Sequence, residues 1–123
     1  MDNFKTEMNA FVHYCHEKSK KAGWWDDVDL EVDGKYVVPA KLCLVHSEIS
    51  EAMEGHRKGL MDDKLTHRQM IEVELADAFI RIADLAGALD LDLGGAILEK
   101  MSYNIRREDH KKENREAEGG KKY

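Results

Sequence analysis

One run of seventeen residues, Val73 to Leu89, constrains the fold more than any other part of the sequence. It holds four charged residues, Glu74, Asp77, Arg81 and Asp84, and its other thirteen residues are apolar or glycine. On an α-helix, at about 100° per residue, the four charges fall within a band roughly 80° wide. A helix that is apolar on nearly all its other sides must be buried. Its polar stripe therefore faces either solvent or an interior cleft.

The rest of the chain also favours helices over strands. The 123 residues include a single proline, and the apolar residues are mostly Leu, Ile, Met and Ala, which suit helices. The hydrophobic content of 42% is enough for a core, and a chain of this length has room for one. We therefore predict an all-α protein, a compact bundle of about four helices per chain, in a single domain covering residues 1–123.

Apolar spacing and helix-end signals give the bounds of the predicted helices. They are residues 3–22 before Gly23, Pro39 to about Lys58 before Gly59, Thr66 as N-cap to about Leu89, and Leu93 to about Arg107 with Asp92 as N-cap. Within residues 24–38, Val28, Leu30 and Val32 alternate with acids before the turn signal Asp33-Gly34, which predicts either a small hairpin or an ordered loop. The charged tail, residues 108–123, either extends the last helix or frays.

Charge and composition exclude several classes of protein. The chain has 25 acidic and 19 basic residues and a formal net charge of -6, which argues against a nucleic-acid-binding surface. No run approaches the 18 or so apolar residues of a membrane span. The first residues lack the pattern of a signal peptide, so we expect a cytoplasmic protein. Two cysteines, Cys15 and Cys43, are too few for a disulfide scaffold.

Two predicted helices each carry a pair of acids three residues apart, Glu48 with Glu51 and Glu74 with Asp77. Residues at this spacing share one helix face. On the second helix, Glu48 and Glu51 border the apolar face, whereas Glu54 lies on the solvated side; the apolar face is formed by Leu42, Val45, Ile49, Ala52 and Met53.

If these two helices pack antiparallel, the four carboxylates converge, and their mutual repulsion requires protons or a cation. Mg²⁺ takes oxygen ligands and usually acts together with substrate phosphates. The pattern therefore predicts a magnesium site that serves a phosphorylated substrate. Pairs of this kind are also common on solvated helix faces, and the pattern alone leaves both interpretations open.

Other metals are less consistent with the sequence. Di-iron bundles use Glu-x-x-His pairs, and none of the six histidines has an acid three residues before it. His13, Cys15 and His16 could bind zinc, but their helix offers no obvious further ligand. We expect these three residues to line the edge of the core instead.

These motifs together resemble a known family, the MazG-like all-α nucleoside triphosphate pyrophosphohydrolases. The group includes dimeric dUTPases, dCTP pyrophosphatases and phosphoribosyl-ATP pyrophosphohydrolases. The acid pairs are separated by 22 residues, as in the family signature. The resemblance covers about Pro39 to Arg107, and its parts are the runs Lys41–Lys58, Glu74–Asp84 and Glu99–Asn104 and the ending Gly120–Tyr123.

The resemblance implies hydrolysis of a nucleoside triphosphate, expected to be a dNTP, between its α- and β-phosphates, in the control or sanitation of nucleotide pools. It implies that Glu48, Glu51, Glu74 and Asp77 bind Mg²⁺, with Mn²⁺ as a substitute. Either Glu48 or Glu51 would also act as the catalytic general base.

The resemblance also implies substrate contacts on the last helix. Lys100 would hold phosphate, and Asn104, four residues later on the same face, would contact the sugar or base. Lys41 is a weaker phosphate candidate, and Trp24 and Trp25 are candidates for stacking on the base. Arg81, one turn after Asp77, is expected to pair with Asp84 or Asp77 instead of contacting substrate.

The apolar third helix needs more cover than three short helices of one chain supply, so we predict a homodimer or a dimer of dimers. The family also forms such assemblies. Two alternatives to dNTP hydrolysis stay open. One is a non-catalytic helical module that binds another protein through its tryptophans and charged tail. The other keeps the fold but acts on phosphoribosyl-ATP or another modified nucleotide.

Overall fold

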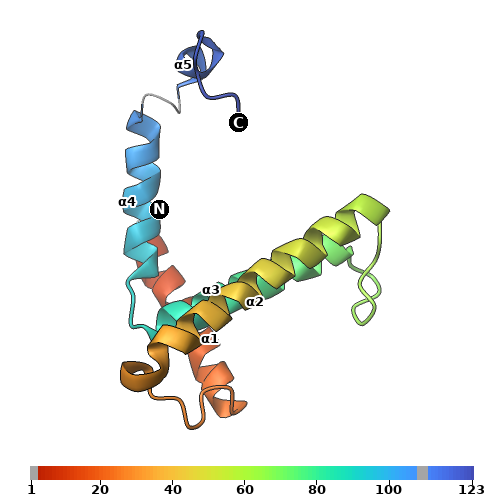
Figure 1. The fold of residues 1–123 in the computed structure, drawn as a ribbon, viewed down its shortest axis with the longest axis vertical. Helices are drawn as coiled ribbons and strands as arrows, with labels where there is room; N and C mark the ends of the chain where they lie inside the picture. Colours follow the sequence, from red (N-terminus) through yellow and green to blue (C-terminus); the bar gives the residue numbers. More distant parts are fainter. Residues whose placement is uncertain (1–2, 108–110) are drawn as a thin grey trace. The chain divides into compact units, whose positions relative to one another are not determined.

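The computed structural model describes residues 3–107 and 111–123, and it is helical (Figure 1). The helices are α1 (Phe4–Lys21), α2 (Leu30–Lys58), α3 (Met70–Ala88), α4 (Leu93–Arg106) and α5 (Lys112–Glu116). Apart from one isolated bridge between Met61 and Gln69, the described residues form no strand. The all-α prediction is confirmed. Within this described part, no helix is both long and apolar enough to cross a membrane.

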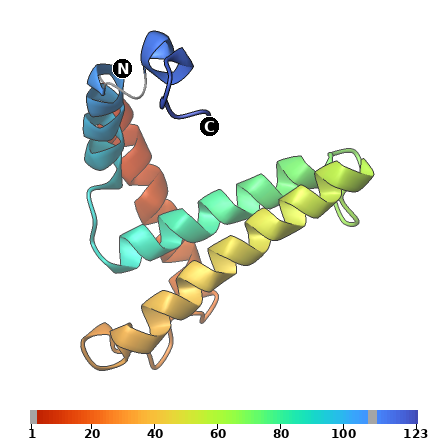
Figure 2. The same ribbon diagram turned by 45° about the horizontal axis from the view of Figure 1, so that its top comes forward.

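The chain divides into two compact units, which are described in turn. The larger unit is Ala10–Leu91, and the smaller combines Met1–Asn9 with Asp92–Tyr123. In the larger unit, α2 and α3 pack side by side along their length, and the loop between Lys58 and Met70 makes them antiparallel (Figure 2). This pairing was the condition for the two acid pairs to meet.

Helix α2 begins earlier than the sequence pattern predicts. Asp29 has an extended backbone, with φ of -111°, and its side chain accepts a hydrogen bond from the backbone N–H of Glu31 at 3.0 Å. Acids in the first turn, Glu31 and Asp33, suit the positive end of the helix dipole. The predicted hairpin or loop is therefore wrong for residues 30–38, and of this predicted stretch only residues 24–27 form turns.

The predicted helix ends are partly correct. Pro39 lies inside α2 instead of at its first position, so one backbone hydrogen bond of the helix is missing there. Gly59 ends α2 in the left-handed conformation, with φ of 63°, and Asp92 caps α4 by accepting from the N–H of Gly95 at 2.9 Å. Thr66 does not cap α3, because the helix begins only at Met70 and Gln69 is its N-cap residue. In the loop before it, the buried Asp62 accepts hydrogen bonds from the backbone N–H groups of Lys64 and Leu65.

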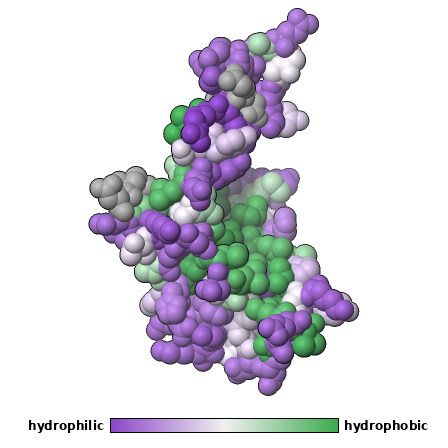
Figure 3. Space-filling model, turned by 90° about the vertical axis from the view of Figure 1, so that its left-hand side faces the viewer, coloured by the Kyte–Doolittle hydropathy of each residue, from purple (hydrophilic) through white to green (hydrophobic). Residues whose placement is uncertain are grey.

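The buried apolar side chains are small. They are Val12, Cys15, Ala52, Ala78, Ala83, Leu85 and Ala86, of which four are alanines. Other helices cover α3 only in part: its large apolar side chains Leu75 and Phe79 are 50% and 42% exposed. Figure 3 shows a broad apolar area open to solvent on one face.

The rotation of α2 also differs from the predicted one. Ala52 and Gly55 are buried, whereas Leu42, Ile49 and Met53 are about half exposed. A Cβ on Gly55 would lie 2.7 Å from the side chain of Met70, so glycine permits a close approach of the two chain segments at this point. The small residues, and not the large apolar ones, form the inner face of α2.

In the smaller unit, the start of α4 packs tightly against the start of α1. A Cβ on Gly94 would lie 2.7 Å from the carbonyl oxygen of Lys5. Asn9 accepts a hydrogen bond from the N–H of Gly94 at 2.8 Å and donates one to Asp92 at 2.7 Å. Of the tail, Lys112–Glu116 forms the short α5, and residues 108–110 lie outside the described residues.

Candidate active site

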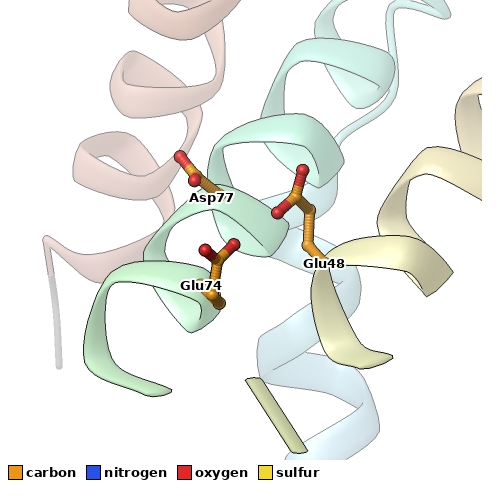
Figure 4. A group of neighbouring side chains, drawn as sticks. All are labelled: Glu48, Glu74 and Asp77. Atoms are coloured by element: carbon orange, nitrogen blue, oxygen red, sulfur yellow. The ribbon is translucent and has the colours of Figure 1, made fainter. Parts of the chain in front are cut away.

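Three of the four predicted metal ligands come together between α2 and α3. Figure 4 shows Glu48 reaching from α2 toward Glu74 and Asp77 on α3. One carboxylate oxygen from each residue lies within 4.8 Å of the others. The antiparallel packing of the two helices therefore produces the convergence that the spacing of the acids predicted.

Glu74 is the most unusual of these acids. The residue is 8% exposed, and its buried Oε2 atom has no hydrogen-bond partner among the described residues. A proton shared with Glu48, burial, and the negative charges of Glu51, Glu48 and Asp77 raise the pKa of Glu74 to about 8. A buried polar atom without a partner costs about 1–3 kcal/mol, a cost that a proton or a bound cation at this oxygen would reduce.

Arg81 supplies one positive charge at this cluster. Its Nε donates to Oε1 of Glu48 at 3.0 Å, so the expected pairing with Asp84 or Asp77 is not the one formed. Burial and then the charge of Glu48 raise the pKa of Asp77, and the charge of Arg81 opposes this shift. One guanidinium offsets only part of the repulsion among three carboxylates.

Glu51, the fourth predicted ligand, lies outside this group of three. Its side chain is on the exposed part of α2, yet its charge contributes to the raised pKa of both Glu74 and Asp77. Its role as a metal ligand or general base stays a prediction. Glu54 instead pairs with Lys58 at 2.6 Å, away from the other acids.

A pocket of about 720 Å³ adjoins the carboxylates. Its volume is in the range of small-molecule sites, roughly 300–1,000 Å³. Acidic, basic and aromatic side chains line it: Glu48, Asp77 and Asp84, then Lys18, Lys41 and Arg81, then Phe11, Tyr14 and Trp24. Its wall thus combines cations and aromatic rings with two of the three converging acids.

The sequence-predicted substrate residues of the larger unit divide into two groups. Lys41 and Trp24 line the pocket, and Trp24 is 70% exposed. The side chain of Trp25 is fixed by a hydrogen bond, which its indole N–H donates to Asp84 at 2.9 Å. The ammonium of Lys41 lies 4.5 Å from the centre of the Trp25 ring, a cation–π contact. Trp24 is therefore better placed than Trp25 for contact with a bound molecule.

Lys100 and Asn104 lie on α4, in the smaller unit. The ammonium of Lys100 is 4.7 Å from the centre of the Tyr103 ring, and Asn104 accepts a hydrogen bond from Arg107 at 3.3 Å. Their roles in binding phosphate and sugar or base stay predictions.

Sequence reasoning missed a hydrogen-bonding group beside the pocket. Asp84 accepts hydrogen bonds from His16, Ser19 and Trp25. The signal for Asp84 was its place in the polar stripe of the third helix, alongside Glu74. No signal indicated its partners, which lie 59 to 68 residues away in the chain.

The carboxylate cluster fits a hard divalent cation. All its donor atoms are carboxylate oxygens, the ligands that Mg²⁺ and Mn²⁺ prefer. Oε2 of Glu74, a residue of this group, is buried and has no hydrogen-bond partner in the described part of the chain, which suits an atom that a cation would contact. The described residues give no comparable group around His13, Cys15 and His16, where zinc was considered.

The resemblance to MazG-like proteins stays a prediction from the motifs of this sequence. In comparisons with known proteins, the chain matches no family model, no curated protein sequence and no solved structure.

Proposed function

We propose that this protein is a magnesium-dependent nucleoside triphosphate pyrophosphohydrolase. It would cleave a dNTP between the α- and β-phosphates, giving a nucleoside monophosphate and pyrophosphate, in the control of nucleotide pools. The observation that carries the proposal is the buried, unpartnered oxygen of Glu74, which lies beside Glu48 and Asp77. The adjoining pocket, with its cations and aromatic rings, suits an anionic molecule that also has a flat ring.

We assign metal binding and the general base to the acidic residues of the site. Glu48, Glu74 and Asp77 would hold the cation, joined by Glu51 if its side chain turns inward. A divalent cation would neutralise the triphosphate, polarise a phosphoryl oxygen and lower the pKa of a bound water. Either Glu48 or Glu51 would take the proton of the attacking water.

Basic and aromatic side chains would bind the rest of the substrate. Lys41 and Arg81 line the pocket and carry the charge needed for phosphate oxygens. Trp24, exposed at the same pocket, offers a face for stacking on the base, an interaction worth about 1–3 kcal/mol. Lys100 and Asn104 are proposed as further contacts by resemblance.

A substrate panel tests the proposal directly. Purified protein is incubated with Mg²⁺ and each dNTP, NTP and phosphoribosyl-ATP, and pyrophosphate and monophosphate are measured. Equal amounts of the two products from at least one substrate are expected, and EDTA should stop their release. No release from any substrate, together with no Mn²⁺ binding in a titration, would leave the non-catalytic interaction module as the better hypothesis.

Glu51 and Glu54 provide a matched pair of variants on α2. Glu51→Gln should keep the fold and lower turnover by at least about a hundredfold. Mutation of a residue that only hydrogen-bonds to a metal ligand lowers activity by about 10–100-fold, and loss of the ligand itself should have a larger effect. Glu54→Gln, which loses only an exposed ion pair with Lys58, should stay within about twofold of the wild type. Steady-state kinetics with circular dichroism would check both. An inactive Glu54→Gln beside an active Glu51→Gln would contradict the proposed ligand set.

We further propose that the active protein is a homodimer or a dimer of dimers. Leu75 and Phe79 on α3 and Ile49 and Met53 on α2 are all 42–59% exposed, although they are large and apolar. Contiguous exposed apolar surface of this kind is typical of interfaces between proteins. A second copy of the chain would complete the cover that α3 lacks.

Sedimentation velocity at micromolar concentration tests this assembly, and a wild-type protein that runs as a clean monomer would contradict it. Met53→Glu places a charge on the exposed apolar face and should shift the protein toward monomer, because burying an unpaired charge is costly. Ser50→Glu adds the same charge at an exposed polar position of α2 and should leave the assembly unchanged.

A further inference from the structure

The carboxylate of Asp84 joins three segments of the larger unit. One oxygen accepts from Nδ1 of His16 and from the indole N–H of Trp25, each at 2.9 Å. The other accepts from the hydroxyl of Ser19 at 2.8 Å and makes a second, longer contact of 3.2 Å with the indole. The side chains of Asp84 and His16 are only 13% and 15% exposed, so these hydrogen bonds are shielded from water.

The backbone is adapted to this group. One turn after Asp84, a Cβ on Gly87 would lie 2.6 Å from the Cβ of His16 and 3.2 Å from the carbonyl oxygen of Val12. Glycine therefore permits α1 to approach α3 closely at this point. The rings of His16 and Trp25 meet edge to face, with their centres 5.4 Å apart.

The segments bonded to Asp84, which are α1 and the turns after it, also contribute side chains that line the pocket. Lys18 precedes Ser19 on α1, and Trp24 precedes Trp25 in the following turns; both line the pocket. The ring of Trp25 supports the ammonium of Lys41, which lines the same pocket. Each of these three side chains thus belongs to, or contacts, a residue next to or within the group that hydrogen-bonds to Asp84.

We propose that Asp84 is a positioning residue for substrate: it holds Lys18, Trp24 and Lys41 in place to bind the polyphosphate and base of a nucleotide. This inference rests on the proposed function. Only a carboxylate suits the position. It offers acceptors alone, whereas an amide has one acceptor oxygen and turns its NH₂ group toward the same donors. A role in positioning predicts an effect on substrate binding, and no effect on the metal centre.

The test uses Asp84→Asn and Trp25→Phe. The second variant keeps an aromatic ring at this position and leaves Asp84 unchanged, but it removes the indole N–H donor, so it stays informative if the first variant fails to fold. Glu72→Gln is the matched control, because it removes an exposed carboxylate of the same helix, one that pairs with Arg68. Far-UV circular dichroism checks the fold of each variant.

The measurements separate binding from chemistry. We expect Asp84→Asn to raise KM, and the Kd of an α,β-methylene nucleoside triphosphate, by at least about tenfold, with kcat within about threefold and Mn²⁺ affinity unchanged. Trp25→Phe should give a smaller loss of the same kind. In ¹⁵N NMR, the indole N–H of Trp25 should exchange slowly in the wild type and rapidly in Asp84→Asn, with exposed Trp24 as the internal reference.

Two results would overturn the inference. Asp84→Asn could retain the wild-type KM and Kd although the indole N–H of Trp25 exchanges rapidly. The hydrogen bonds of Asp84 would then have no effect on nucleotide binding in the pocket. The variant could instead lose kcat or Mn²⁺ affinity at unchanged KM, which would assign Asp84 to the metal centre.

Failure of the proposed function would look different. Wild-type protein would then hydrolyse no substrate of the panel, and the affinities of wild type and Asp84→Asn for inorganic tripolyphosphate would decide the inference. A tenfold weaker affinity of the variant supports it. Equal affinities, or no binding by the wild type, reject it.

Discussion

The variant Glu74→Gln is expected to release no measurable pyrophosphate and yet to melt at a higher temperature than the wild-type protein in EDTA at pH 8. The loss of activity, at least about a hundredfold, follows from removing a proposed metal ligand. The gain in stability follows because glutamine carries no charge into a buried site that already holds Glu48 and Asp77. A gain of about 1 kcal/mol would raise the melting temperature by roughly 4 °C.

The cation should reverse this order of stability. Mg²⁺ that binds only the folded wild type stabilises it by mass action, and the variant should gain much less. Differential scanning calorimetry with Mg²⁺ and with EDTA, combined with the pyrophosphate assay, checks both parts. Glu72→Gln, which changes an exposed carboxylate of the same helix, should change neither. An active Glu74→Gln, or one stabilised by Mg²⁺ as strongly as the wild type, would contradict the proposed ligand set.

The stability of the wild type in EDTA should fall as the pH rises from about 5 to 8. The pKa of Glu74 is about 8 in the folded protein, against 4.5 for an ordinary glutamate, so only the folded state holds this proton in that window. Stability decreases with pH wherever the folded state binds more protons, by up to about 1.4 kcal/mol per pH unit for one proton. The raised pKa of Asp77 acts in the same direction.

Urea unfolding at several pH values, in EDTA and in Mg²⁺, measures this dependence. Because the cation competes with the proton, Mg²⁺ should stabilise the wild type more at pH 8 than at pH 5.5. The variant Glu74→Gln should show a flatter profile in EDTA. A wild-type stability in EDTA that rises between pH 5.5 and 8 would show that the carboxylates do not repel one another as inferred.

The acid pairs could be predicted from the sequence because their spacing sets the face on which they lie. Which member of the α2 pair joins the group could not be predicted, since it depends on the rotation of α2. The large apolar residues, such as Ile49 and Met53, suggested one inner face, but Gly55 allows Met70 to approach closely and turns Glu48 inward while Glu51 stays exposed. Close packing at a small residue outweighed the apolar pattern.

The start of α2 and the pocket wall were beyond sequence reasoning for different reasons. The alternation in residues 28–32 is too short to outweigh a cap by Asp29 and a helix-favouring first turn. Pro39, predicted as the first residue of a helix, lies inside a helix that continues on both sides of it. The contacts of Asp84 join residues about sixty positions apart. Such contacts follow from the packing of α1 on α3, for which the charge pattern of a single helix gives no indication.

The small side chains of the core have a consequence for how the protein must be handled. Alanines supply most of the buried apolar positions, so each chain on its own gains little from burial, roughly 25 cal/mol for each Å² removed from water. If the exposed apolar faces meet those of another copy, much of the folding free energy comes from association. The melting temperature should then increase with protein concentration. Dilution to nanomolar concentration would weaken the fold and the site together, and assays at low enzyme concentration would underestimate the activity.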